Sequence, residues 1–327
     1  MIYNRLGKTG LQVSEVCLGT MTFGNEADES TSHALMDDAL GRGINFFDGA
    51  HNYNKGATEE IVGRWLPAHR REIILTSKVF FPSGGGMNDQ GISRRNIIFS
   101  VEKSLQRLQT DYIDILYLHH WDEDAALEHS LAALTTLVEQ GKVLYCGLSN
   151  FAAWQMMKAV GLTQLHNYAP IVCVQPMYSL VKRQVEVEIL LMAQHEELAV
   201  VPYNALGAGL LTGKYLEQGN SGRLTEAEMY RQRYDDERYV EVTRRFIELA
   251  REKDIPPAPL AVAWVMANPV VTSTIVGART LEQFRQTMQC VDLRLSMEQR
   301  SEITRLSIDP PLATDREPME AMKTRGW

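Results

Sequence analysis

The run Tyr112-Ile113-Asp114-Ile115-Leu116-Tyr117-Leu118-His119 is a short apolar stretch that ends in a titratable side chain. Two earlier runs have the same form: Ile44-Asn45-Phe46-Phe47 ends in Asp48, and Ile73-Ile74-Leu75-Thr76-Ser77 ends in Lys78. Short runs of this kind, separated by helical patterns, are typical of βαβ units that build a parallel sheet. The chain is therefore predicted to belong to the α/β class.

Strand-like runs recur along most of the chain. The predicted strands are Val13 to Leu18, Ile44 to Asp48, Ile73 to Lys78, Tyr112 to His119, Leu144 to Ser149, Ile171 to Pro176, Val200 to Tyr203 and Thr274 to Val276. Eight parallel strands favour a closed (β/α)8 barrel, or TIM barrel, over an open sheet, because closure leaves no exposed edge. A length of 327 residues fits two average domains or one such barrel, and we interpret residues 1–327 as a single barrel domain.

Helix signals lie between the strands. Ser93 to Leu108 carries apolar residues at steps of three and four, which predicts a helix with one buried face. Thr280 followed by Gln283 is a capping-box pattern, which predicts a helix start directly after Arg279. Such a start presents free backbone donors at the end of the last strand.

Three segments fall outside the repeat. Tyr3 to Gln12 has glycines at positions 7 and 10, which predicts an N-terminal β-hairpin covering the bottom of the barrel. Lys214 to Tyr239 is a long polar insertion after the seventh strand, and we interpret it as a functional loop at the C-terminal face rather than a domain linker. The polar tail from Pro310 to Trp327 is expected to lie on the surface.

Charge and composition exclude several classes of protein. The net charge of -8 and the pI of about 5.6 disfavour nucleic-acid or anionic-membrane binding, because both need a concentrated positive field. Because the chain has neither a secretory signal nor an apolar run long enough to span a membrane, we expect a soluble, cytoplasmic protein. The four cysteines are widely spaced, which favours reduced, buried thiols over disulfides or metal ligands.

Side chains at the C-terminal ends of barrel strands meet on one face. We therefore expect Asp48, Lys78 and His119 to share one mouth, and Tyr53 follows Asp48 in the adjoining loop. A tyrosine, with an ordinary pKa of about 10, becomes a better proton donor when a cation stabilises its phenolate. Lys78 can supply that cation, and Asp48 can hold Lys78 charged and oriented. His119 can donate a hydrogen bond to a substrate carbonyl, so the set is typical of carbonyl reduction.

Each of these residues also has an ordinary structural interpretation. A single tyrosine is more often a packing residue, and a single lysine at a strand end is usually solvated. The functional interpretation depends on the four residues occurring together on successive barrel elements.

Longer motifs surround the four residues. They are Phe46-Phe47-Asp48-Gly49-Ala50-His51-Asn52-Tyr53, Thr58-Glu59-Glu60-Ile61-Val62-Gly63, Thr76-Ser77-Lys78 and Asp111-Tyr112-Ile113-Asp114. Further motifs are Gly19-Thr20-Met21-Thr22-Phe23-Gly24, Gly147-Leu148-Ser149-Asn150-Phe151, Val174-Gln175-Pro176, Leu206 to Lys214 and Gly277-Ala278-Arg279. In this order they resemble the aldo-keto reductase superfamily over nearly the whole chain, in its branch of channel β-subunits and aryl-alcohol dehydrogenases.

The resemblance implies an NADP-dependent oxidoreductase of the alcohol dehydrogenase or aldehyde reductase type. Hydride would pass from NADPH to the carbonyl of an aldehyde or ketone, reversibly, with Tyr53 as general acid. In that family the residues matching Asp48 and Lys78 assist the tyrosine, and the residue matching His119 orients the carbonyl.

The sequence motifs for cofactor binding are less specific than those of the catalytic residues. No Gly-x-Gly-x-x-Gly motif follows a strand, and Gly207 to Lys214 lacks the spacing of a Walker A loop. Its glycines still allow backbone donors to approach a pyrophosphate. Arg279 precedes a predicted helix start, where a guanidinium and free backbone donors suit a phosphate dianion, which favours NADPH over NADH. The structural alternative is an exposed, solvated arginine.

By position, the resemblance assigns the cofactor contacts. Ser149, Asn150 and Gln175 match residues that hold the nicotinamide carboxamide, and Tyr203 matches the ring stacked on the nicotinamide. The loop over the pyrophosphate is matched by Leu206, Gly207, Gly209 and Lys214. The remaining matches are Gly19, Thr20, Met21, Gly277, Arg279, Gln283, Gln286 and Thr287, the last standing where an asparagine usually contacts the adenine.

Aromatic side chains near the strand ends can wall an apolar pocket for a neutral aldehyde or ketone. They are Phe23, Phe80, Phe81, Trp121 and Tyr178. Core packing explains any one of them about as well.

Two other functions are consistent with parts of the sequence. His119-His120 with Asp122 and Glu123 could indicate a metal-dependent hydrolase, but adjacent strand residues point to opposite faces and cannot easily bind one ion, so we predict no metal. Aldo-keto reductase folds also serve as potassium-channel β-subunits, which bind NADPH as redox sensors with little turnover. His119 stands where that branch has asparagine, so we predict turnover.

Overall fold

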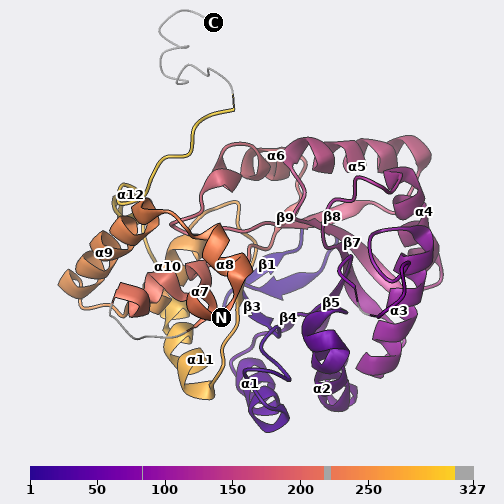
Figure 1. The fold of residues 1–327 in the computed structure, drawn as a ribbon, viewed down its shortest axis with the longest axis horizontal. Coiled ribbons are helices and arrows are strands. Elements are labelled where there is room, and N and C mark those ends of the chain that lie inside the picture. The colour runs from indigo at the N-terminus through magenta and orange to yellow at the C-terminus, as the bar shows by residue number, and fades with distance from the viewer. Residues whose placement is uncertain (83, 217–221, 314–327) are drawn as a thin grey trace, which may run out of the picture.

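Parallel strands form the inside of the molecule and helices surround them (Figure 1). The computed structural model describes residues 1–82, 84–216 and 222–313. The eight strands are β3 (Val16–Gly19), β4 (Phe46–Asp48), β5 (Ile74–Val79), β6 (Ile113–Leu118), β7 (Val143–Ser149), β8 (Ile171–Gln175), β9 (Ala199–Val200) and β10 (Thr274–Val276). They pair in the order β10-β3-β4-β5-β6-β7-β8-β9, every pair parallel.

Backbone hydrogen bonds between the regions of β9 and β10 close the sheet. The amide of Thr272 donates to the Val200 carbonyl (2.8 Å), and the amide of Ile275 donates to the Pro202 carbonyl (3.0 Å). Pro202 has no N–H to donate in return, so regular pairing across this seam is short. The predicted (β/α)8 barrel is confirmed.

Helices cover the outside of the barrel. The longer ones are α1 (Glu29–Gly41), α2 (Ala57–Trp65), α3 (Arg94–Leu108), α4 (Leu127–Glu139), α5 (Ala153–His166), α6 (Ile189–His195), α9 (Glu237–Glu252), α10 (Pro257–Met266), α11 (Leu281–Thr287) and α12 (Met297–Thr304). The α3 prediction is confirmed: Ser93 caps the helix by accepting a hydrogen bond from the Asn96 amide, and Ile97, Val101 and Leu108 are buried.

Strand periodicity divides the core into two clusters and also points the site residues inward. Phe46 packs inside the barrel, whereas Phe47 packs outward against the helices. In β6, Ile115 and Tyr117 lie inside, whereas Leu116 lies outside. Because side chains alternate along a strand, residues two positions after an inward one also face the barrel interior. The same alternation turns four site side chains toward the barrel interior, because each lies an even number of positions after an inward-facing residue. They are Asp48, Lys78, His119 and Gln175.

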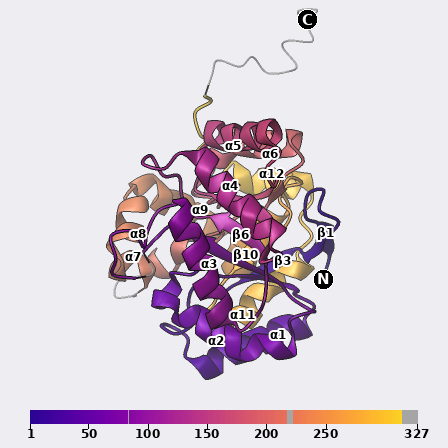
Figure 2. The same cartoon turned by 90° about the vertical axis from the view of Figure 1, so that its right-hand side faces the viewer.

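The two ends of the barrel carry different additions. The hairpin of β1 (Tyr3–Arg5) and β2 (Gln12–Ser14) lies at one end with the N-terminus (Figure 2). The insertion, which contains α7 (Arg223–Glu226) and α8 (Glu228–Arg233), lies at the other end. The predictions for both segments are therefore confirmed in position, although the insertion contains short helices rather than only loop.

Two strand predictions differ most from the observed extents. The predicted strand Val13 to Leu18 is divided at Glu15, where β2 of the hairpin ends and the barrel strand β3 begins. The Glu15 carboxylate accepts hydrogen bonds from the Ile2 amide (3.0 Å) and the Arg294 guanidinium (2.6 Å), and these contacts hold the bend. The predicted strand Val200 to Tyr203 is regular only at Ala199–Val200, next to Pro202.

Two smaller predictions concern the surface tail and the cysteines. Residues 311–313 are exposed, and residues 314–327 of the predicted tail and 217–221 of the insertion lie outside the described residues. Cys17, Cys146, Cys173 and Cys290 are free and buried, as expected.

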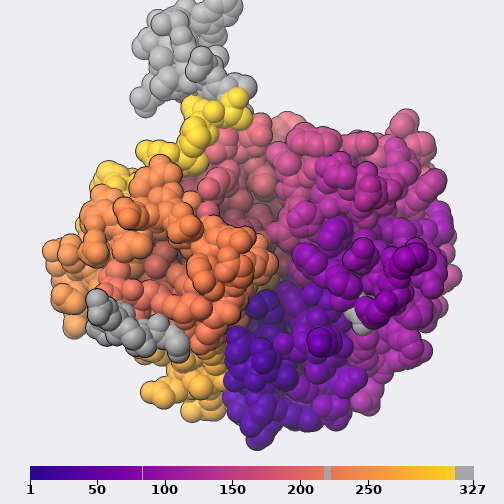
Figure 3. Space-filling model, viewed as in Figure 1, coloured from indigo at the N-terminus to yellow at the C-terminus, as the bar shows by residue number. Residues whose placement is uncertain are grey.

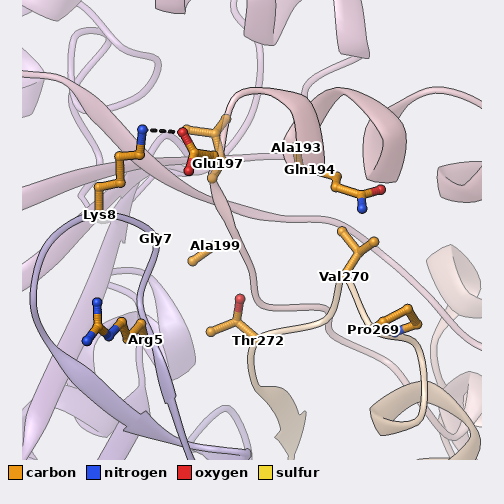
Figure 4. A pocket seen from close by; sticks show the side chains of 11 residues that line it. Arg5, Gly7, Lys8, Ala193, Gln194, Glu197, Ala199, Pro269, Val270 and Thr272 are labelled. Atoms are coloured by element: carbon orange, nitrogen blue, oxygen red, sulfur yellow. Dashed lines mark ion pairs between the residues drawn. The ribbon is translucent and has the colours of Figure 1, made fainter.

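A shallow hollow of about 240 Å³ lies at the bottom of the barrel (Figure 4). It is lined by hairpin residues, including Arg5 and Lys8, and by residues at the starts of β9 and β10. Lys8 forms an ion pair with Glu197 there. This hollow is at the opposite end of the barrel from the carboxyl ends of the strands, where the chemistry-bearing side chains meet.

Candidate active site

The Lys78 ammonium group is the centre of a buried polar cluster at the carboxyl ends of β4 and β5. Its Nζ donates to Asp48 Oδ2 (2.6 Å), to the Gly49 carbonyl (2.8 Å) and to Tyr53 Oη (3.2 Å). Lys78 is completely buried, and Tyr53 begins the short 3₁₀ helix η1 (Tyr53–Gly56). The structure therefore brings Asp48, Tyr53 and Lys78 into direct contact.

Both oxygens of the Asp48 carboxylate have hydrogen-bond donors. Oδ2 accepts from Lys78, and Oδ1 accepts from Thr76 Oγ1 (2.8 Å) and Gln175 Nε2 (2.7 Å). A buried charge is tolerated only when it is paired and hydrogen-bonded in this way. The carboxylate is thus fixed by the neighbouring strand β5 and by β8 on the far side of the barrel.

The pKa values of the lysine and the tyrosine respond to burial and to each other. Burial disfavours the charged form of Lys78, but Asp48 and Tyr53 together outweigh it, and the Lys78 pKa lies above its usual value. Burial raises the pKa of Tyr53, and Lys78 opposes this rise. Lys78 therefore lowers the Tyr53 pKa, as expected from the sequence, but burial has the larger effect. Both groups are protonated at neutral pH.

His119 follows β6 and lies beside the tyrosine. Its ring and that of Tyr53 meet edge-on with centroids 6.2 Å apart, and the ring of Phe81 meets it edge-on with centroids 5.0 Å apart. Burial, and secondarily the charge of Lys78, holds the pKa of His119 well below its usual range. The imidazole is therefore neutral and has one N–H to donate. Within the described chain, its Nδ1 has no hydrogen-bond partner.

His51 is a buried polar residue that the sequence did not single out. It lies between Asp48 and Tyr53 in the chain, is 1% exposed, and neither ring nitrogen has a hydrogen-bond partner among the described residues. Burial lowers its pKa to about 4. Arg107 holds its main chain by donating to the His51 carbonyl (3.0 Å). The only sequence signal for it was its place inside the Asp48-to-Tyr53 motif.

The residues matched to the nicotinamide carboxamide form a chain of hydrogen bonds that reaches the catalytic cluster. Tyr203 Oη donates to Asn150 Oδ1 (2.7 Å), and Asn150 Nδ2 donates to the His119 carbonyl (2.9 Å). Ser149 Oγ donates to the carbonyl of Gln175 (2.9 Å), whose side chain binds Asp48. Asn150 has a φ of 56°, a left-handed conformation that asparagine tolerates better than most residues. The structure places these predicted residues together.

The glycine-rich segment after β9 forms η4 (Gly207–Thr212), entered through Leu206. Gly207 and Gly209 have φ values of 57° and 91°, which glycine adopts at no steric cost. The Lys214 ammonium lies over the ring of Tyr215, 4.7 Å from its centroid. The predicted pyrophosphate segment is thus a tight turn at the C-terminal face.

The remaining predicted cofactor residues gather where β3 and β10 pair. Gly277 packs against the carbonyl of Gly19, and a Cβ at Gly277 would lie 3.3 Å from that oxygen. Thr20 is fully buried and donates to the Asp48 carbonyl (2.9 Å), whereas Met21 is partly exposed. Gln283 and Gln286 are exposed on α11, where they can meet a ligand.

The start of α11 is confirmed, and the capping box is half formed. Thr280 Oγ1 accepts from the Gln283 amide (3.2 Å), whereas the Gln283 side chain accepts from the amide of Arg279 rather than that of Thr280. Thr287 is buried and donates to the Gln283 carbonyl. Its hydroxyl is therefore engaged within its own helix.

The predicted pocket aromatics divide into two groups. Phe81 contacts His119, Phe80 packs on Phe81 with centroids 5.2 Å apart, and Trp121 packs against Phe151. Trp154, which is 61% exposed and packs edge-on against Trp121, was not predicted. These side chains lie near the mouth.

The structure does not bring Phe23 and Tyr178 to this mouth. Phe23 is fully buried in the core cluster outside the barrel. Tyr178 is also fully buried, packs on Trp264, and its hydroxyl group contacts Glu186, Asn268 and Arg300. Both have the packing role that was the structural alternative.

Nearly the whole chain resembles proteins of one family. A family model described as "Aldo/keto reductase family" matches residues 15–308. The chain belongs to this family. Family membership supports oxidoreductase activity with a nicotinamide cofactor and a small carbonyl substrate.

Several relatives are similar over nearly their full length. An uncharacterized oxidoreductase YrpG of Bacillus subtilis (strain 168) is 40% identical over 311 residues, 91% of this chain and 93% of the relative. Protein tas of Escherichia coli (strain K12) is 35% identical over 334 residues, covering 93% and 96%. A probable voltage-gated potassium channel subunit beta of Arabidopsis thaliana is 33% identical over 306 residues, covering 90% and 92%.

Other kinds of site were sought in residues 1–82, 84–216 and 222–313. These residues contain no group of three or more His, Cys, Asp or Glu side chains that could hold a metal ion. None of the helices formed by them is both long and apolar enough to cross a membrane.

Proposed function

We propose that this protein reduces the carbonyl of an aldehyde or ketone with NADPH, and can oxidise the alcohol in reverse. The observation that carries the proposal is the contact of Lys78 Nζ with both Asp48 and Tyr53 Oη, beside a neutral His119. A neutral imidazole and a protonated phenol are two hydrogen-bond donors on rings whose centroids lie 6.2 Å apart, which suits an oxygen that gains negative charge.

The residues around this cluster fit a nicotinamide cofactor. Ser149 and Gln175 are buried polar side chains at the carboxyl ends of β7 and β8, and Asn150 and Tyr203 complete the hydrogen-bonded chain that leads to His119. These four would hold the nicotinamide end, and the turn beginning at Gly207 and the start of α11 after Arg279 would hold the phosphates. Bound NADPH supplies the hydride.

The protein's own groups then direct the proton. Tyr53 donates its hydroxyl proton to the carbonyl oxygen as that oxygen becomes an alkoxide. Lys78 stabilises the resulting tyrosinate, and Asp48 keeps the lysine charged. His119 donates a hydrogen bond to the same oxygen and so orients the carbonyl. The aromatic rings of Phe81 and Trp121 would exclude water and favour neutral, apolar substrates.

A spectrophotometric assay tests the proposal. The absorbance of reduced nicotinamide should fall when the protein is mixed with NADPH and a panel of aliphatic and aromatic aldehydes and ketones, and should not fall without the carbonyl compound. A protein that binds NADPH but turns over no member of the panel would contradict the proposed enzyme.

Such a result would favour a second candidate, an NADPH-binding regulatory subunit located in the cytoplasm. Similarity to proteins named as probable potassium channel β-subunits in Arabidopsis thaliana and Oryza sativa supports this alternative. The buried, neutral imidazole at His119 favours the enzyme, because it places a second donor at the reacting oxygen.

A further inference from the structure

The guanidinium group of Arg279 lies between two carboxylates. Its Nη2 is 3.4 Å from Glu26 Oε1 and 3.8 Å from Glu226 Oε2. Glu26 is also 3.7 Å from Nε of Arg223, so it bridges two arginines. Arg279 is the residue expected from the sequence to bind a phosphate of NADPH, and here it is already paired with negative charges.

The two carboxylates come from different elements at the same end of the barrel. Glu26 lies in the loop between β3 and α1, and Glu226 is the last residue of α7 in the insertion. Figure 3 looks onto this face, where the insertion, in orange, meets the N-terminal segments, in indigo. The β3–α1 loop is also joined to the Arg279 loop by a hydrogen bond from Thr22 Oγ1 to the Ala278 carbonyl (2.7 Å). The carboxylates are therefore held near Arg279 from two sides.

We infer that Glu26 and Glu226 reduce the preference for the phosphorylated over the unphosphorylated cofactor by competing with the 2′-phosphate for Arg279. The inference rests on the proposed NADPH-dependent function. A phosphate dianion must displace the carboxylates from the guanidinium group before it can pair with Arg279. A cofactor with a 2′-hydroxyl group needs no such displacement. The two glutamates thus weaken NADPH binding without an equal effect on NADH.

The size of the effect follows from the geometry. Arg279 is 31% exposed and Glu226 is 54% exposed, and the contact distances are long, so each ion pair is of the weak, partly solvated kind. Removing one carboxylate should change affinity by about fivefold, which corresponds to about 1 kcal/mol. The competition therefore adjusts the selectivity and does not reverse it.

Calorimetric titration with NADP+ and with NAD+, without a carbonyl substrate, tests the inference through binding alone. Glu226→Gln removes one charge and should lower the Kd of NADP+ by about fivefold while changing the Kd of NAD+ by less than about twofold. Glu228→Gln is the matched control, because it makes the same charge change in the same insertion, where Glu228 pairs with Arg231 instead. The control should leave both Kd values near those of the wild type.

A second arm repeats Glu226→Gln in an Arg279→Ala background. If the carboxylate acts through the guanidinium group, its removal should then have no effect on the Kd of NADP+. Equal changes for the two nucleotides, or an effect that persists without Arg279, would mean that Glu226 only holds the insertion in place, and would overturn the inference. A wild-type protein that binds neither nucleotide would instead refute the proposed function, and this inference with it.

Discussion

At the scale of single residues, the central feature is a phenol that is kept protonated. Burial raises the pKa of Tyr53, and the raised pKa of Lys78 keeps a positive charge 3.2 Å from its oxygen. A proton donor must hold its proton until charge develops on the acceptor, and the lysine then stabilises the anion left behind. The elevated pKa is therefore compatible with an acid role, although it differs from the direct acidification expected from the sequence.

Tyr53→Phe removes this proton and little else. We expect kcat for carbonyl reduction to fall by about 10³-fold, because general acid catalysis contributes on this order, while the Kd of NADP+ stays within about twofold. Steady-state assays and calorimetry measure the two quantities. Tyr168→Phe, at a partly buried ring just beyond α5, is the control and should change neither. Retained turnover in Tyr53→Phe would refute the acid assignment.

The Asp48 and Lys78 pair makes a separate prediction about stability. Asp48→Asn leaves the Lys78 ammonium buried with no anionic partner, so the free energy of unfolding should fall by about 3–5 kcal/mol. Urea denaturation measures this change. The double variant Asp48→Asn with Lys78→Met should be more stable than Asp48→Asn alone, since no charge is then left unpaired. A double variant that is less stable than both single variants would contradict the role of the pair.

Most of the catalytic cluster could be predicted from single residues, because strand periodicity fixes their direction. Asp48, Lys78 and His119 each end an apolar run, and the structure places all of them in one mouth. Gln175 could be matched to a cofactor contact, but its bond to Asp48 joins positions 127 apart. Such a contact depends on closure of the barrel, and no local sequence pattern indicates it. Tyr178 was misplaced for the same reason, since its partners Asn268 and Arg300 are distant in the chain.

At the scale of elements, the sequence predicted a boundary correctly where residues of that element determine it. The prediction failed where tertiary contacts determine the boundary. The start of α3 follows from Ser93, and the start of α11 follows from Thr280. The bend at Glu15, in contrast, depends on Arg294, which is 279 positions away. The run from Val13 to Leu18 contains the polar residues Ser14 and Glu15, but no glycine or proline that would indicate a bend there.

The cap of α11 links an element to the proposed cofactor site. Thr280→Ala removes the hydroxyl group that accepts from the Gln283 amide, and should lower the free energy of unfolding by about 1 kcal/mol. Because the first turn of α11 would then fray beside Arg279, we also expect weaker NADP+ binding. Thr280→Ser keeps the oxygen and should restore both properties. Denaturation and calorimetry test these expectations, and equal behaviour of the alanine and serine variants would contradict the capping role.

At the scale of the whole molecule, the two ends of the barrel have different roles: one end is covered by structural elements, and the other carries the residues proposed for catalysis and cofactor binding. The hairpin occupies one end and the insertion the other (Figure 2), and the glycine turn and the catalytic cluster lie after the carboxyl ends of the strands. Closing the barrel buries the charged pair and also the imidazoles of His51 and His119. The site therefore depends on ionisation states that only the folded protein maintains, so its stability should depend on pH.

The lowered pKa of His51 determines the direction in which stability changes with pH. In the unfolded chain it binds a proton below about pH 6.5, whereas burial lowers its pKa to about 4 in the folded protein. Between these values the unfolded state binds more protons, so stability falls as the pH falls through this window, by up to about 3 kcal/mol. The lowered pKa of His119 acts in the same direction.

His51→Gln removes one of these titrations and should reduce the loss of stability on acidification. Urea midpoints of the wild type and the variant, measured between pH 7 and pH 4.5, should diverge at neutral pH and approach each other, or cross, as the pH falls. His129→Gln, on the exposed face of α4, is the control and should follow the wild type throughout. Comparing variants cancels the titration of other groups, such as the buried Glu59. A constant offset between wild type and His51→Gln over the whole range would show that His51 does not stay neutral in the folded protein.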